Sequence, residues 1–185
     1  MSTWSATQPL TVIGSTPTAS SLLESNVCVR EAGPADAADI YALVTEYLED
    51  GHLLPRGLDE IRVHVHRFLV ATQDDRVVGC GELAPLSSDV AEIRSLVVSR
   101  GLRSLGLGAE IIERLVQRAT SCGFEKLCAF THRPSYFVVH HGFSIVPHVW
   151  LPEKIVTDCH SCPHFRRCAQ YAVMRALGQR RLSHG

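Results

Sequence analysis

The apolar positions of the chain change their period repeatedly after Val27, between the alternation typical of strands and the spacing typical of helices. The strands that this pattern predicts are Val27–Arg30, Arg67–Thr72, Arg76–Leu83, Val90–Val98, Lys126–Thr131 and Phe143–Val149. The predicted helices run from Gly33-Pro34 to Gly51 and over Leu58–His66, Gly106–Ser121 and Pro134–His141. Because strands and helices alternate, the sequence predicts an α/β (α+β) domain in which helices cover a sheet.

The two ends of the chain differ from this pattern. Residues 1–25 are rich in Ser and Thr and carry hardly any charge, which predicts a flexible N-terminal tail, and residues 179–185 predict a frayed C-terminal tail. The remaining residues, 26–178, are expected to form one domain. Just before the C-terminal tail, a short amphipathic helix that covers the sheet or meets a second subunit is predicted from Tyr171, Val173, Met174 and Leu177. A homodimer is therefore left open.

Composition and charge exclude several classes of protein. The 185 residues are 45% hydrophobic and 20% charged, which is typical of a soluble globular domain. The net charge of −1 lacks the basic excess of a general nucleic-acid binder. No apolar run approaches the roughly 20 residues that cross a bilayer, and no charged leader precedes Arg30. The seven cysteines are an odd number, so reduced thiols and a cytoplasmic location are expected.

A glycine-containing loop between the strand Val90–Val98 and the next helix carries the clearest chemical signal. Its sequence is Arg103-Ser-Leu-Gly106-Leu-Gly108. The leading N–H groups of a helix have no partner within the helix and can bind an anion such as a pyrophosphate. Glycines at two positions let the backbone approach that group, and Arg103 adds positive charge. A purely structural turn is the alternative for this loop taken alone.

Arg103-x-x-Gly106-x-Gly108 after the strand Glu92–Val98 resembles the acyl-CoA motif of the GNAT acetyltransferases, and Gly142-Phe143 lies where that family has its "GF" turn. The resemblance covers about residues 27–150. It implies a mixed, twisted sheet with a V-shaped splay between its central strands, helices on both faces, and acetyl-CoA in the splay. The cofactor-binding residues that it implies are Leu96, Val97, Val98, Arg103, Ser104, Leu105, Gly106, Leu107, Gly108 and Ala109. A backbone N–H near Val97 or Val98 would polarise the thioester carbonyl.

Two further segments resemble N-acetylglutamate synthases, the amino-acid N-acetyltransferases of the arginine pathway. One is Leu53-Leu-Pro-Arg56, and the other is Leu151-Pro-Glu-Lys154 with the Cys-x-x-Cys that follows it, as in the short bacterial forms. The resemblance implies acetylation of the α-amine of L-glutamate in the first step of arginine biosynthesis. Two alternatives remain: a GNAT enzyme for another small amine or a protein N-terminus, and a non-catalytic module that senses acetyl-CoA or zinc.

A glutamate substrate presents two carboxylates, which arginine binds well through its planar guanidinium group. The candidate substrate-binding residues are Arg56, Arg94, Ser95 and Lys154. The amine must lose a proton before it attacks the thioester, and Glu92, on the strand that flanks the splay, is the candidate general base. Transfer is expected to be direct, in a ternary complex with the small amino acid.

The leaving thiolate has no assigned proton donor. Many GNAT enzymes have a tyrosine four residues before the glycine of the "GF" turn, and here that position is Val138. Tyr136 is two residues earlier, about 200° around a helix, and is therefore expected to face elsewhere.

A cysteine-rich segment, residues 158–170, follows the GNAT-like region. Cys159, Cys162 and Cys168 are candidate zinc ligands, since Cys-x-x-Cys is a common half-site. Reduced structural thiols and a redox role are the alternatives for this segment.

Overall fold

A computed structural model of the chain describes residues 27–48, 53–162 and 167–178. The predicted tails, residues 1–25 and 179–185, lie outside the described residues, as does part of the cysteine-rich segment, residues 163–166.

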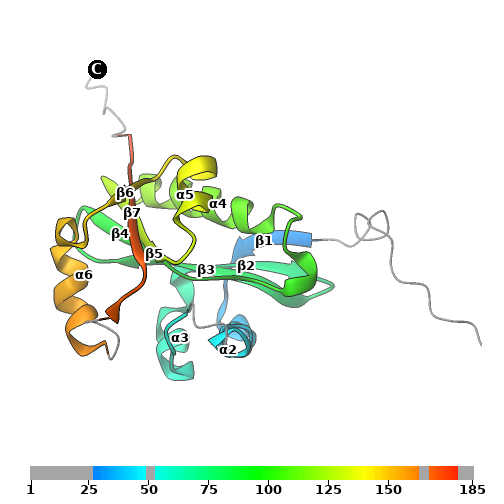
Figure 1. The fold of residues 1–185 in the computed structure, drawn as a ribbon. Coiled ribbons are helices and arrows are strands. Elements are labelled where there is room, and N and C mark those ends of the chain that lie inside the picture. Colours follow the sequence, from blue (N-terminus) through cyan, green and yellow to red (C-terminus); the bar gives the residue numbers. More distant parts are fainter. Residues whose placement is uncertain (1–26, 49–52, 163–166, 179–185) are drawn as a thin grey trace, which may run out of the picture.

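The described residues contain one mixed sheet of seven strands in the order β1-β2-β3-β4-β5-β7-β6 (Figure 1). The strands are β1 (Val27–Glu31), β2 (Phe68–Gln73), β3 (Arg76–Pro85), β4 (Val90–Val98), β5 (Lys126–Thr131), β6 (Ser144–Val146) and β7 (Tyr171–Ala176). Neighbouring strands are antiparallel except for β4 and β5, which are parallel. The predicted mixed α/β architecture is therefore confirmed.

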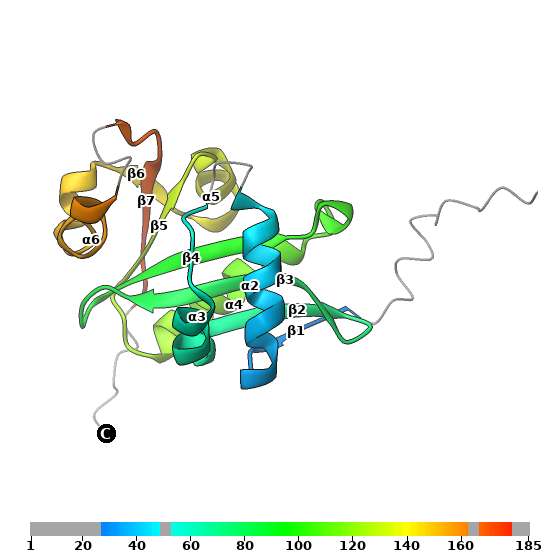
Figure 2. The same cartoon turned by 90° about the horizontal axis from the view of Figure 1, so that it is seen from below.

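Helices cover both faces of this sheet (Figures 1 and 2). One face carries α2 (Ala37–Glu46) and α3 (Leu58–His64), and the other carries α4 (Leu107–Ser121) and α5 (Pro134–His141). The helix α6 (Pro152–Thr157) lies beside β7. Short 3-10 helices are η1 (Pro34–Asp36), η3 (Val65–Arg67), η4 (Arg100–Leu102), η5 (His148–Trp150) and η6 (Cys159–Ser161). None of the helices within the described ranges has the length and apolar character needed to cross a membrane.

The long helix α4 packs very closely on β3. Its buried stripe includes Ile111 and Leu115, both without solvent exposure. Two glycines of β3 face this stripe, and a Cβ atom on Gly81 would lie 2.8 Å from Ile111 Cγ2 and 3.1 Å from Leu115 Cδ1. The absence of a side chain at Gly81 therefore sets how closely α4 approaches the sheet.

We expect Gly81→Ala to lower stability by about 1–3 kcal/mol, because an added methyl group overpacks this contact. In a chain of this size each kcal/mol lowers Tm by roughly 2–4 °C, so thermal denaturation followed by circular dichroism measures the effect. Gly178→Ala is the control, since its added Cβ meets no atom within 4 Å. Equal Tm values for the two variants would contradict the packing argument.

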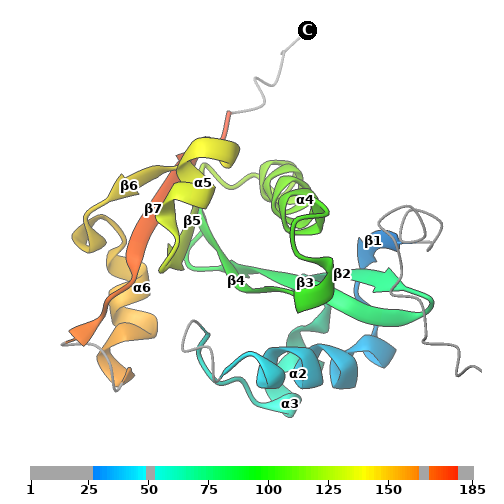
Figure 3. The same ribbon diagram turned by 45° about the vertical axis from the view of Figure 1, so that its right-hand side comes forward.

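The central strands β4 and β5 separate after four residue pairs. Their pairing runs from Val90 opposite Lys126 to Ile93 opposite Ala129, whereas β4 continues to Val98 beside β3 alone among the described strands. Figure 3 shows the two strands diverging. This is the predicted V-shaped splay, and it leaves the β5-facing edge of residues 94–98 without a neighbouring strand in the described structure.

A β-bulge bends β4 where the splay begins. Cys80 is opposite Val97 and Glu82 is opposite Arg94, so two residues of β4 face the single residue Gly81. One of these two, Ser95, has a positive φ of 49°, and its carbonyl accepts a hydrogen bond from Cys80 Sγ at 3.3 Å. The bulge turns the rest of β4 away from β5.

The prediction for the C-terminal segment is wrong: residues 171–176 form β7, a strand between β5 and β6, and not an amphipathic helix. Ala172 and Val173 are both fully buried although they point to opposite faces, because helices or loops cover both sides of the sheet here. A strand that is buried on both faces gives a continuous apolar run without alternation, and such a run does not distinguish a strand from a helix.

Two other elements differ from expectation between the "GF" turn and the cysteine-rich segment. The strand predicted over Phe143–Val149 is limited to Ser144–Val146, since Pro147 cannot donate a hydrogen bond to the ladder. The helix α6 was not predicted; it begins at Pro152, which suits the first position of a helix.

Candidate active site

The loop before α4 has the backbone geometry expected of an anion site. Gly106 caps the helix with a φ of +83°, and Ser104 has a φ of +76°, so the chain turns sharply at both residues. Glu110 is the first residue whose N–H bonds into the helix, to the Gly106 carbonyl at 3.0 Å. The leading amides of the helix at residues 107–109 therefore have no acceptor one turn earlier. They are the part of the predicted pyrophosphate site that is best placed to bind it.

Two amides of the predicted site form hydrogen bonds within the loop itself. Arg103 N–H donates to the Arg100 carbonyl and Leu105 N–H donates to the Leu102 carbonyl, each at 3.4 Å. The Arg103 side chain bonds back to β4, with 3.1 Å from Nε to the Val98 carbonyl oxygen. These contacts fix the loop against the end of the strand that borders the splay.

Tyr47, directly after α2, contacts the same loop from the face of the sheet opposite to α4. Its side chain is 3% exposed, and its hydroxyl accepts the Arg100 backbone N–H at 2.8 Å. The guanidinium carbons of Arg100 and Arg103 lie 5.2 Å and 5.0 Å from the centre of its ring, within the range of cation–π interactions. Tyr47 was not singled out in the sequence because its partners lie more than fifty residues away.

We expect Tyr47→Phe to raise the KM for acetyl-CoA by about three- to tenfold while the KM for the amine changes little. The reason is that the Arg100 amide loses a buried partner, which costs about 1 kcal/mol and loosens the loop. Steady-state kinetics with each substrate varied in turn measures the effect. Tyr41→Phe, which removes a hydroxyl from the more exposed side of α2, is the control. An unchanged KM for acetyl-CoA would contradict this anchoring role.

Tyr136 corrects an expectation about α5. A Cβ atom on Gly108 would lie 3.2 Å from the Tyr136 hydroxyl, so this side chain reaches the N-terminus of α4 instead of facing elsewhere. Burial raises the pKa of its phenol, which keeps the group protonated. Val138, at the position where many GNAT enzymes have tyrosine, is 37% exposed. The hydroxyl at the predicted cofactor loop, residues 103–109, thus comes from Tyr136, near the start of α5.

A ring of four alternating charges lies on the side of β4 opposite to α4. Glu92 Oε2 accepts hydrogen bonds from Arg94 Nε at 2.6 Å and from Lys154 Nζ at 2.8 Å. Asp158 Oδ2 closes the ring, with 2.7 Å to Lys154 Nζ and 2.5 Å to Arg94 Nη2. Three of the predicted site residues therefore lie together: Glu92 and Arg94 on β4, and Lys154 from 62 residues further along the chain.

The ring is largely withdrawn from water. The side chains of Glu92 and Lys154 are 3% and 7% exposed, and that of Arg94 is 19% exposed. Burial by itself lowers the pKa of Arg94, but Glu92 and Asp158 more than offset it, so the pKa lies above its ordinary value. Arg94 is positively charged at every pH of interest.

Arg56 lies against a second buried carboxylate. Its Nη2 is 3.0 Å from Glu82 Oε2 and 2.9 Å from Glu60 Oε1. Glu82 is 1% exposed, and neither of its oxygens has a hydrogen bond of good geometry among the described residues. Glu82 also faces Arg94 across the β3–β4 ladder, so the Arg56 pair and the ring are neighbours on one face of the sheet.

Sequence reasoning missed two acids of this polar cluster, Glu82 and Asp158. Glu82 is a charge within an otherwise apolar predicted strand, which is itself a signal of a buried functional or paired group. Asp158 follows Lys154 by four residues, the spacing that brings two side chains together on a helix. Of the predicted substrate residues, Ser95 is at the β4 bulge and contributes its carbonyl oxygen to the Cys80 contact described above.

The cysteine-rich segment gives the zinc prediction no support. Among the residues that the structure describes, no group of three or more His, Cys, Asp or Glu side chains is placed to hold a metal ion. Cys159 and Cys162 are half-buried and Cys168 is exposed, and all three are free thiols. Burial raises the pKa of the Cys159 thiol.

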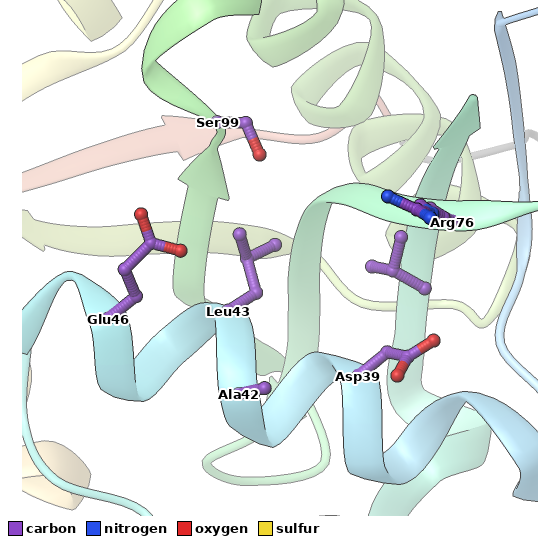
Figure 4. Close-up of a pocket in the computed structure, with 7 residues that line it drawn as sticks. Asp39, Ala42, Leu43, Glu46, Arg76 and Ser99 are labelled. Carbon is purple, nitrogen blue, oxygen red and sulfur yellow. The ribbon is translucent and has the colours of Figure 1, made fainter. Parts of the chain in front are cut away.

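A separate groove of about 370 Å³ lies between α2 and the start of β3 (Figure 4). Figure 4 shows Asp39 and Glu46 on one wall, Arg76 on the other and Ser99 at the end near the cofactor loop. None of the predicted site residues lines it.

Comparisons with known proteins find related sequences and structures. The Acetyltransferase (GNAT) family matches residues 37–143 of the chain. An uncharacterized N-acetyltransferase, CT2212, of Chlorobaculum tepidum is 30% identical over 153 residues, which are 83% of this chain and 98% of the relative. An amino-acid acetyltransferase of Shewanella oneidensis is 30% identical over 132 residues, which are 71% of this chain but only 30% of that protein.

Solved structures show the same relationship. The N-acetylglutamate synthase of Neisseria gonorrhoeae, complexed with coenzyme A and N-acetyl-glutamate, superimposes with a TM-score of 0.73 at 25% identity, over 84% of this chain and 36% of that one. Rv2747 of Mycobacterium tuberculosis, in complex with CoA and NLQ, gives a TM-score of 0.70 at 26% identity, over 82% and 99% of the two chains. With the loop, the splay and the family match together, the chain belongs to the GNAT family of acetyltransferases.

Proposed function

We propose that this protein is an acetyl-CoA-dependent N-acetyltransferase that acetylates the α-amine of L-glutamate, in the first step of arginine biosynthesis. The observation that carries the proposal is the convergence of Arg56, Arg94 and Lys154 on one face of the sheet, across β4 from the cofactor loop. Arginine side chains suit carboxylate groups because the planar guanidinium binds both oxygens, and Lys154 adds a third positive charge. The names of the relatives, amino-acid acetyltransferase and N-acetylglutamate synthase, support the same substrate class.

Acetyl-CoA is proposed to bind on the α4 side of the splay. Its pyrophosphate accepts hydrogen bonds from the leading amides of α4, at residues 107–109, and Arg103 contributes positive charge. Its pantetheine arm pairs with the edge of β4 that β5 leaves free, at Leu96 and Val98, in the manner of an added strand. The thioester carbonyl then lies near the backbone N–H of Val97 or Val98, which polarises it as negative charge develops.

The amino acid is proposed to enter from the opposite side, where the polar cluster lies. Its carboxylates bind Arg56 and the Arg94–Lys154 pair, which directs the amine toward the thioester. Glu92 accepts the proton of the amine, directly or through a water molecule. The nitrogen lone pair attacks the thioester carbon, the C–S bond breaks, and CoA leaves as the thiolate without an acyl-enzyme intermediate. The thiolate then takes up the second proton, which the nitrogen loses as the amide forms.

Product mass spectrometry tests this function. The purified protein is incubated with acetyl-CoA and a panel that contains glutamate, glutamine, aspartate, a polyamine and a peptide N-terminus. The expected result is preferential formation of N-acetylglutamate. Acetylation of another amine would overturn glutamate as the substrate, but the assignment as an N-acetyltransferase would stand. Binding of acetyl-CoA without any acetylated product would overturn the enzymatic assignment and favour a non-catalytic sensor module.

A further inference from the structure

Asp158 differs from the other members of the charge ring. It is the most exposed of the four, with 28% of its side chain accessible, whereas its partner acid Glu92 is 3% exposed. It follows the last residue of α6, a helix of six residues, and Glu92 is in the middle of a central strand. One acid of the ring is therefore fixed within the sheet, and the other is supplied by the end of a short surface helix.

The ring is electrically balanced only because Asp158 is present. Arg94 and Lys154 supply two positive charges, and Glu92 neutralises one of them. Asp158 Oδ2 touches both cations at once, which is the position that a carboxylate of the substrate would take between the same two groups. An incoming carboxylate and the Asp158 carboxylate would compete for these donors.

We propose that Asp158 is a built-in substitute for a substrate carboxylate: it occupies the Arg94–Lys154 position in the free enzyme and is displaced when a carboxylate ligand binds. The inference rests on the proposed function only in that the substrate is a carboxylic acid. It makes Asp158 a specificity-determining residue, because a ligand without a carboxylate at this position cannot replace it. Amines that lack such a carboxylate leave Asp158 bound to Arg94 and Lys154, so this position stays closed to them.

Displacement has a measurable cost. If the ring holds Asp158 about nine-tenths of the time, the apparent affinity for a carboxylate is reduced about tenfold relative to an open site. Removing the Asp158 carboxylate should remove this cost.

The test uses glutarate, a dicarboxylate that has no amine and therefore binds without turnover. Isothermal titration calorimetry in the presence of CoA compares the wild type with Asp158→Asn and Asp158→Ala. Both variants are expected to bind glutarate about tenfold more tightly. The control is Glu153→Gln, which removes one negative charge from the same helix outside the ring and should leave the affinity near that of the wild type. Unchanged or weaker binding in the Asp158 variants would overturn the proposal, as would an equal gain in Glu153→Gln.

Kinetics and crystallography give independent readouts. Asp158→Asn should lower the KM for the carboxylate substrate, whereas loss of a structural or ammonium-binding role would raise KM. A crystal structure of the glutarate complex should show a ligand carboxylate on Arg94 and Lys154 with Asp158 moved away. Asp158 retained on both cations would refute displacement. Failure of the wild type to acetylate glutamate would refute the proposed function but leave these binding results valid.

Discussion

Glu92→Gln is expected to lower kcat by about 10²- to 10⁴-fold, the range lost when a general base is removed. The Glu92 side chain is 3% exposed and is held by Arg94 and Lys154, so glutamine at this position keeps the shape of the group but not its ability to take a proton. The loss should be largest at low pH, where the amine is protonated and a base is hardest to replace. The pH profile of kcat, measured by CoA release with mass detection, checks this.

The control for this variant is again Glu153→Gln, whose acid lies on α6 outside the ring. Thermal denaturation distinguishes a catalytic loss from a rearranged ring, because removing one partner of a buried ion pair also destabilises the fold. A well-folded Glu92→Gln protein whose activity falls equally at every pH would exclude Glu92 as the base.

Arg56→Ala is expected to raise the KM for glutamate by about 10²-fold and to leave the KM for acetyl-CoA little changed. The pair that is lost is the one between Arg56 and a substrate carboxylate, and truncating one partner of a buried charge pair in a binding site costs about 2–5 kcal/mol. The same change also leaves Glu82, which is 1% exposed, without its cation, so stability should fall by about 3–5 kcal/mol. Steady-state kinetics and urea denaturation measure the two effects.

A double variant separates binding from stability. Arg56→Met with Glu82→Leu replaces the buried pair by apolar groups, which is often neutral for stability, and should recover the fold but not the KM for glutamate. Arg62→Ala is the matched control, since Arg62 is on α3 and 58% exposed. Equal increases in the KM values of both substrates would contradict the assignment of Arg56 as a carboxylate-binding residue.

The elements that sequence reasoning located best are those with clear boundary residues. The predicted bounds of β4, β5 and α5 agree with the structure at both ends. Before β4 is the turn-forming run Ser87-Ser-Asp89, and α5 begins with Pro134 and ends before Gly142 at a φ of +67°. The strand β7 carried no such signals, and its apolar run fits a helix as well as a buried strand. Its identity depends on the neighbours that cover it.

The same distinction applies to the candidate site. Arg56, Arg94, Lys154 and Glu92 could be selected by residue type and motif, because each carries a charge beside an apolar segment. Their pairing could not be predicted, since Glu92 and Lys154 are 62 residues apart and meet only when α6 packs on the folded sheet. The prediction that Tyr136 faces away from the loop failed for a similar reason. The position of a residue around a helix gives its direction relative to the helix axis, but the sequence does not show how that axis is oriented against α4.

The position of β7 has a consequence for how the protein is made. This strand pairs with both β5 and β6 and joins them, and it is translated after both. During synthesis, β5 and β6 therefore leave the ribosome with unpaired edges and remain without their shared partner until residues 171–176 emerge. Unpaired edges are sites of aggregation. Emergence of residues 171–176 from the ribosome, more than any earlier stage of translation, should be the step after which the nascent domain ceases to need a chaperone.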